Sequence, residues 1–212
     1  MSATGGVERA FRALREAIEK HLVEVLDHLQ PPEAFDRAVF EGRTGFEQLG
    51  ELWALTGGQA EETILGVFGG AQLLGPGACA HERAKWADLL DASGIANPSW
   101  DSSTSLDPHA VRGVYFAAGW FPLLREPLEG NYLAVDLDPL PGGTPGQIIV
   151  CGRDEDEKCV VAPDVVSLLE RLGDECEQGL WSFEDTEDGP FVEREGGRLF
   201  GQAKRWLPHA ED

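Results

Sequence analysis

The chain has 212 residues, of which 42% are hydrophobic and 26% charged, and its 17 Lys and Arg against 38 Asp and Glu give a net charge of −21. An acidic surface repels nucleic acid and anionic lipid, and no apolar run approaches the roughly 20 residues that cross a bilayer. We therefore expect no nucleic-acid or membrane partner. The first residues lack a basic segment followed by an apolar one, which predicts a cytoplasmic protein.

The clearest predicted element is an amphipathic helix over residues 7–29. Apolar residues recur there at steps of three and four, the spacing that places side chains on one stripe of a helix. The stripe comprises Val7, Phe11, Leu14, Ile18, Leu22, Val25 and Leu29. The pair Pro31-Pro32 is predicted to stop the helix. Because an apolar stripe needs a partner surface, we expect this helix to dock on the rest of the molecule.

Two shorter helices are predicted next, with irregular structure around them. They span residues 46–55, before Gly57-Gly58, and residues 81–90. The apolar, glycine-containing stretch 63–74 is predicted to form short strands or a turn. The polar stretch 97–108 is predicted to be a connection.

From residue 112 the hydrophobic pattern becomes that of strands. Short β-branched or aromatic segments are separated by Gly and Pro, which is typical of an antiparallel meander. The predicted strands span residues 113–121, 131–137, 147–151 and 158–161. Pro163 then begins a helix with Asp164 in its first turn, where the helix dipole favours an anion, and Gly173 is predicted to end it.

Acidic residues dominate the stretch 170–195, with aromatic residues between them. We expect this region to pack loosely on the domain through its aromatics, followed by a short helix ending in Lys204, Arg205 and Trp206. The predicted organisation is an N-terminal helix and connection, a central domain and an acidic C-terminal extension, over residues 1–43, 44–172 and 173–212. The predicted fold class is α+β, with an antiparallel meander flanked by helices.

No stretch supplies a complete set of groups for catalysis or cofactor binding. The glycine-rich stretch 142–146 lacks the lysine and the following helix of a phosphate loop, and the consecutive acids 154–157 point in different directions in a turn rather than into a calcium site. Asp136 and Asp138 share a strand face and could shift each other's pKa, although Asp before Pro139 is also ordinary turn chemistry. We predict no catalytic residue, no cofactor and no metal.

The cysteines and histidines form no recognisable motif. The four cysteines contain no C-x-x-C pair, so their spacing does not indicate zinc, and we expect buried reduced thiols. Cys151 and Cys159 flank a predicted hairpin and could be neighbours. His81 is predicted to lie at a helix N-terminus.

The ordered motifs of the central region resemble the Smi/Knr type of the SUKH superfamily. GWFPLL, GNYLAVDLDP, GQIIVCGRDEDEKCVVA and a helix beginning PDVVSLL follow the family pattern over residues 44–172. The matching positions are Trp120, Pro122, Gly130, Asn131, Asp136, Leu137, Pro139, Gly146, Gln147, Gly152, Arg153 and Asp154. The resemblance implies an antiparallel sheet flanked by helices. Bacterial members are immunity proteins that bind a toxin, and fungal members are regulatory scaffolds in cell-wall synthesis.

The main functional prediction is a bacterial immunity protein that neutralises a cognate toxin, such as a nuclease, by binding it. The alternative is a regulatory or scaffold protein of cell-wall assembly or signalling, and a third hypothesis is an enzyme that uses Asp136 with Arg153 or Asp156. The acidic charge predicts a basic protein partner, a toxin domain under the first hypothesis. The sequence also leaves open whether the chain forms a homodimer. The predicted partner-binding residues are Asn131, Asp136, Gln147, Arg153, Asp154, Asp156, Glu184 and Asp185.

Overall fold

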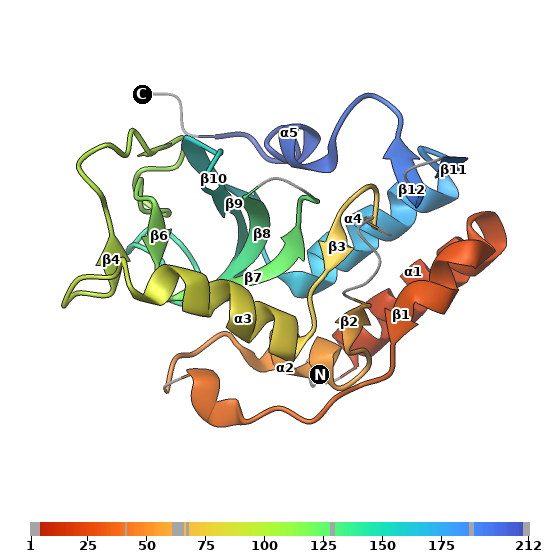
Figure 1. Cartoon of the computed structure of the whole chain (residues 1–212), viewed down its shortest axis with the longest axis horizontal. Helices are drawn as coiled ribbons and strands as arrows, with labels where there is room; N and C mark the ends of the chain where they lie inside the picture. The colour runs from red at the N-terminus through yellow and green to blue at the C-terminus, as the bar shows by residue number, and fades with distance from the viewer. Residues whose placement is uncertain are drawn as a thin grey trace.

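A six-stranded sheet forms the centre of the computed structural model (Figure 1). Residues 5–40, 42–60, 66, 68–127, 130–186 and 189–209 are described, with the backbone alone for 185, 186, 189 and 190. The strand order is β3-β7-β8-β9-β10-β5. Its four long strands are β7 (Trp120–Arg125), β8 (Asn131–Asp136), β9 (Gln147–Gly152) and β10 (Glu157–Ala162), each antiparallel to the next. The predicted meander is therefore confirmed.

The two edge strands of the sheet come from segments with weaker strand patterns. β3 (Gln72–Leu73) pairs antiparallel with β7, within the stretch predicted as short strands or a turn. β5 (Thr104–Ser105) pairs parallel with β10, inside the polar stretch predicted to be a connection. A two-residue polar edge strand is fixed by its partner rather than by its own hydrophobic pattern, so that prediction missed it.

The strand predicted over residues 113–121 is divided in the structure. β6 (Phe116–Ala117) pairs with β4 (Ile95–Ala96) in a separate two-stranded sheet, and β7 starts only at Trp120. All residues of β8 and β9 are buried, because the central strands are covered on both faces. This explains their nearly continuous apolar sequence.

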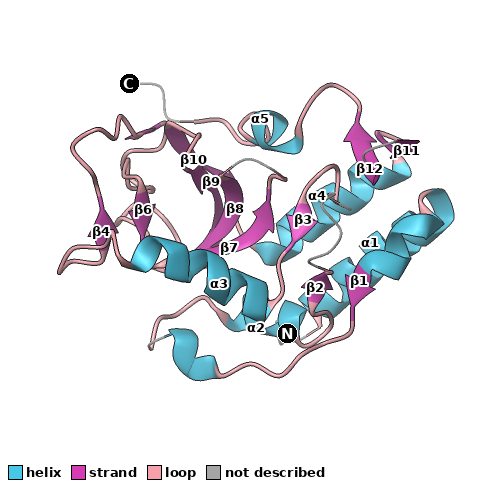
Figure 2. Cartoon of the chain, in the orientation of Figure 1, coloured by secondary structure: helices cyan, strands magenta, loops and turns pink. Residues whose placement is uncertain are grey.

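Helix α1 (Gly6–His21) packs along α4 (Val165–Glu177), and Figure 2 shows the two side by side. The predicted stripe is buried from Val7 to Val25, which confirms that the helix docks on the molecule. The predicted length to residue 29 is wrong. The backbone leaves the helix at Leu22, a 3₁₀ helix follows over Val23–His28, and β1 (Leu29–Gln30) pairs with β2 (Gly58–Gln59).

Two further helix boundaries differ from the prediction. α4 continues through Gly173 to Glu177 and packs against α1 there: a Cβ at Gly173 would lie 3.6 Å from the Cα of Leu14, an ordinary contact distance. Asp164 is the N-cap of α4, where its carboxylate accepts a hydrogen bond from the Ser167 N–H at 2.8 Å.

The remaining α-helices before the meander contact α1, α4 or β7. α2 (Glu47–Trp53) agrees with the prediction within two residues, and η2 (Arg37–Phe40) precedes it. α3 (Pro76–Ala87) lies beside β7 and begins five residues earlier than predicted. Pro76 occupies its first turn, a position that suits proline, so His81 lies inside the helix rather than at its N-terminus.

The acidic C-terminal region forms a hairpin and a short helix. β11 (Trp181–Thr186) pairs with β12 (Gly189–Arg194), and α5 (Leu199–Ala203) follows, just before the predicted helix end at Lys204–Trp206. Of the aromatics expected to attach this region, Trp181 is buried, and Phe183 and Phe191 are partly buried. The predicted acidic residues Glu187 and Asp188 lie outside the described residues.

An ion pair joins this hairpin to α4. The guanidinium of Arg194 contacts both carboxylate oxygens of the buried Glu175, at 2.8 and 2.9 Å. Because two guanidinium nitrogens contact two carboxylate oxygens, this ion pair fixes the orientation of the hairpin on α4 as well as its position. The extension is therefore held more firmly than loose aromatic packing alone would predict.

The four cysteines are free and buried, as predicted. Cys159 lies opposite Val150 in the β9–β10 pairing, so Cys151 points to the other face of the sheet. The sequence left open whether Cys151 and Cys159 are neighbours, and the structure places their side chains on opposite faces of the sheet. Among the described helices, none has the length and apolar character required to traverse a bilayer. Helices beside largely antiparallel strands make the fold α+β, as predicted.

Candidate functional site

The predicted partner-binding residues fall into three separate places. Asp136 and Gln147 face each other at one end of the β8–β9 pair, and Asn131 lies opposite Gly152 at the other end. A six-residue strand spans about 17 Å, so the two ends do not share a site. Glu184 is exposed on β11, which Figure 1 places far from β10. Asp185 follows it in the strand, and its side chain lies outside the described part.

Asp136 and Gln147 form a buried structural pair. The carboxylate of Asp136 accepts from the Asp138 N–H at 3.0 Å and from the Gln147 amide at 3.2 Å. The Gln147 oxygen accepts in turn from the Thr144 N–H at 3.1 Å, which closes the turn between β8 and β9. Burial raises the pKa of Asp136 to about 6, although the two N–H donors and the Arg112 charge favour the carboxylate.

The two aspartates that were expected to share a face have different surroundings. Asp136 is buried, whereas Asp138 lies beyond the end of β8 and its carboxylate contacts Arg112 at 3.3 Å. Arg153 and Asp156 are at the opposite end of the strands from Asp136. The geometry therefore does not assemble the acid–base pair that the enzyme hypothesis requires.

Asn131, Arg153, Asp154 and Asp156 do come together, at the turn between β9 and β10. The side-chain oxygen of Asn131 accepts from the Asp154 N–H at 3.1 Å, and its side-chain amide nitrogen donates to the Glu126 carboxylate at 2.9 Å. Gly152 has φ +140, and a Cβ there would lie 2.3 Å from the Gly130 oxygen. This close approach requires glycine, which accounts for the Gly-Arg-Asp sequence at the turn.

The exposed part of the turn carries an ion pair. Arg153 contacts the Asp154 carboxylate at 2.8 Å, and this contact lowers the Asp154 pKa. Both side chains face solvent, so the pair contributes little to stability and remains available to a partner.

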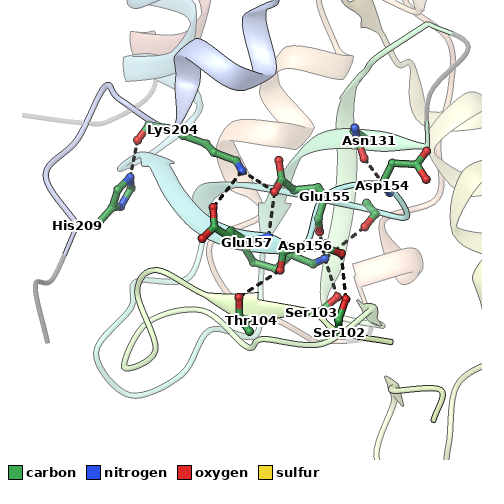
Figure 3. A network of polar contacts seen from close by, with 12 residues as sticks. Ser102, Ser103, Thr104, Asn131, Asp154, Glu155, Asp156, Glu157, Lys204 and His209 are labelled. Atoms are coloured by element: carbon green, nitrogen blue, oxygen red, sulfur yellow. Dashed lines mark hydrogen bonds and ion pairs between the residues drawn. The ribbon is translucent and has the colours of Figure 1, made fainter. Parts of the chain in front are cut away.

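The other side of the turn is attached to β5 and α5 (Figure 3). The Asp156 carbonyl accepts from the Thr104 N–H at 2.7 Å, and the Ser102 hydroxyl reaches the Asp156 carboxylate at 3.4 Å. The Glu155 carboxylate pairs with Lys204 at 2.5 Å. Glu157 is exposed but also reaches Lys204 at 3.9 Å, whereas Asp154 pairs with Arg153 and Asp156 contacts Ser102. The predicted divergence of the consecutive acids is therefore only partial, because Glu155 and Glu157 share one lysine.

A buried lysine that the sequence interpretation overlooked supports this turn from beneath. Lys158 is fully buried in β10, donates to the Ser103 hydroxyl at 2.8 Å and also contacts the carbonyl oxygens of Gly152 and Glu155. Burial lowers its pKa. The available signal was a single lysine inside an otherwise apolar strand.

A hollow beside Arg153 adds an aromatic surface to the site. It has a volume of about 380 Å³, and its lining includes Trp86, Leu89, Tyr115 and Tyr132. Trp100 is 67% exposed and stacks edge-on against Tyr115, with ring centroids 5.0 Å apart. Arginine and large aromatics are the side chains that most often anchor protein partners. We call Trp100, Tyr115, the hollow and the Arg153–Asp154 pair the turn surface.

Comparison with known proteins identifies relatives that match about half of the chain. No family model matches the chain. The cell wall biosynthesis and cell cycle regulator smi1 of Schizosaccharomyces pombe is 35% identical over 103 residues, which are 49% of this chain and 20% of the relative. The cell wall assembly regulator SMI1 of Saccharomyces cerevisiae is 37% identical over 104 residues, again 49% and 20%.

A glucan synthesis regulatory protein of Neurospora crassa is 39% identical over 98 residues, which are 43% of this chain and 18% of the relative. The chain thus aligns with about a fifth of the length of these curated relatives. Their names favour the regulatory alternative over the toxin-immunity prediction, which they do not support. About half of this chain is therefore similar in sequence to a segment of these fungal cell-wall regulators, which agrees with the Smi/Knr resemblance of its motifs.

Proposed function

We propose that this chain is a non-enzymatic, cytoplasmic protein-binding module that acts as a regulator or scaffold in cell-wall assembly. The observation that carries the proposal is the alignment with proteins named as cell wall assembly regulators. The toxin-immunity alternative would use the same binding property with a different partner.

The site chemistry supports binding rather than turnover. The polar groups of Asp136, Gln147 and Asn131 form hydrogen bonds with the main chain and with neighbouring side chains. These three residues therefore stabilise the fold of the domain. The turn surface instead exposes Trp100 and Arg153, which suit a protein contact. The net charge of −21 would steer a basic partner towards the chain, and it disfavours nucleic acid and anionic membranes.

The experiment is deletion of the chain in the organism that encodes it, followed by growth under wall-targeting stress. We expect a wall defect that the intact chain reverses. Trp100→Ala and Arg153→Ala should fail to reverse it while keeping the native circular dichroism spectrum. Arg12→Ala removes an exposed arginine of α1 that pairs with Glu8 and serves as the matched control.

A normal wall in the deletion strain would contradict the regulatory proposal. If that strain were instead killed only by toxin-secreting neighbours, the function would be immunity. Full complementation by both turn-surface variants would show that the partner contacts another face.

A further inference from the structure

Asp107, Cys159 and His209 meet beside β10 although they come from three separate segments. One potential ligand atom from each lies within 4.8 Å of the others. Carboxylate oxygen, thiolate sulfur and imidazole nitrogen are the protein ligands of zinc, with bonds of about 2.0–2.3 Å. Ligand atoms around a tetrahedral zinc ion lie about 3.3–3.6 Å apart at those bond lengths. The three ligand atoms therefore need only a small rearrangement to bind one metal ion.

The contacts of His209 fit a ligand role. Its Nε2 lies 2.5 Å from the Lys204 carbonyl oxygen, a contact in which Nε2–H donates. Its Nδ1 lies 3.0 Å from Asp107 Oδ2. With Nε2 protonated, the neutral ring presents a lone pair to a carboxylate oxygen, so either a second proton or a shared cation must lie between them. A histidine whose other nitrogen donates to a main-chain carbonyl is the usual arrangement around metals.

The surroundings of Asp107 and Cys159 also suit the binding of a metal ion. Asp107 Oδ2 accepts from the Val160 N–H at 2.8 Å, which fixes the carboxylate beside β10. The Cys159 side chain is fully buried, and its thiol makes no hydrogen bond within the described residues. The neighbouring Lys204 ammonium contacts Glu155 at 2.5 Å and Glu157 at 3.9 Å, which offsets part of its charge, although that charge still acts on the Cys159 thiol.

We propose that Asp107, Cys159 and His209 bind one zinc ion or a similar borderline divalent cation, with water in the fourth position. The metal would replace the thiol proton of Cys159 and tie the segment after α5 and the loop after β5 to the edge of the sheet. Binding requires the Cys159 thiol to lose its proton, so zinc affinity should increase with pH.

The test uses the full chain after treatment with a chelator. Zinc is titrated in competition with a chromophoric chelator, and cobalt(II) is added separately to look for thiolate-to-cobalt charge-transfer absorption. We expect one equivalent per chain and a cobalt band that disappears in Cys159→Ser. His209→Gln should weaken zinc binding by at least ~100-fold, since it removes a direct ligand. His81→Gln, an exposed histidine on α3, should bind zinc like the wild type.

Circular dichroism of each variant establishes that it is folded before titration. If folded wild-type chain takes up no zinc at micromolar concentrations, a second proton on His209 holds the contact with Asp107 and the proposal is wrong. Equal zinc affinity in wild type and His209→Gln would mean adventitious binding elsewhere, which also overturns it. Raised thermal stability with zinc in the wild type, absent in His209→Gln, would support the structural role.

Discussion

Asn131 connects two segments that are distant in sequence, since its amide donates to Glu126 and its oxygen accepts from the Asp154 N–H. Asn131→Asp keeps the acceptor but places a carboxylate 2.9 Å from the Glu126 carboxylate, in a position that is only 9% exposed. We expect a loss of about 2–3 kcal/mol in unfolding free energy at neutral pH, measured by urea denaturation.

The double variant Asn131→Asp with Glu126→Gln distinguishes charge repulsion from lost shape. The new amide at 126 can donate to the new carboxylate, so most of the stability should return. A double variant as unstable as Asn131→Asp would show that repulsion is not the cause.

Titration of Asp136 should lower the free energy of unfolding as pH rises, whereas an aspartate with a lowered pKa has the opposite effect. Its pKa is raised from 3.8 to about 6 by burial, so between these values the folded chain retains a proton that the unfolded chain releases. This contribution to stability is complete below about pH 4 and is lost as pH rises through about 6, by up to about 3 kcal/mol.

Asp136→Asn removes this titration. The difference in unfolding free energy between the wild type and the variant should therefore fall as pH rises from 4 to 6 and stay level above that range. Urea denaturation followed by tryptophan fluorescence at each pH measures it. A constant difference across the range would mean that Asp136 does not titrate there.

At the scale of elements, α4 places a glycine, Gly173, against α1. Gly173→Ala adds a Cβ that meets the Leu14 Cα at 3.6 Å, an ordinary contact, and removes the entropy cost of glycine in a helix. We expect stabilisation of about 0.5–1 kcal/mol. Gly173→Leu needs room that the helix pair lacks and should destabilise by about 1–3 kcal/mol.

Thermal unfolding of the two variants beside the wild type checks this pair of predictions. If Gly173→Leu were as stable as Gly173→Ala, the helices would not be in close contact at this point.

The sequence predicted the elements whose own residues determine them. The strands β8 and β9 are apolar throughout and separated by Gly and Pro, and the stripe of α1 has a clear helical period. The predictions that failed concern residues in contact with a distant segment: among the described strands β5 pairs only with β10, and Gly173, where α4 continues, faces Leu14 of α1. These contacts join distant residues, which no local pattern encodes.

The candidate site also combines residues that the sequence located with residues that only the structure brings together. The Gly-Arg-Asp turn was located from its motif, and Asn131 joined it because β8 and β9 pair in register. Asp136 and Gln147 were assigned to the same surface because they lie in the same motif series, yet pairing places them at the far strand end. Trp100 and Tyr115 were missed because their proximity to Arg153 depends on how the loops around β4 and β6 return to the sheet.

At the scale of the whole molecule, the four buried thiols report on whether the chain opens as one unit. Cys79 lies in α3, Cys151 and Cys159 in neighbouring strands, and Cys176 in α4. Burial raises the pKa to about 12 for the first three and to about 11 for Cys176. In the native chain at pH 8 we expect all four to react with a disulfide reagent at least ~100-fold more slowly than free cysteine.

Reaction then requires opening of the structure, and its rate follows the population of open states. Since α1, α4, the sheet and the hairpin share one contiguous core, low concentrations of urea should accelerate all four thiols together. A faster class containing Cys176 alone would mean that α4, with the hairpin joined to it through Glu175, opens before the sheet. Mass spectrometry of partly labelled chain distinguishes the two outcomes, because cooperative opening yields only unlabelled and fully labelled molecules.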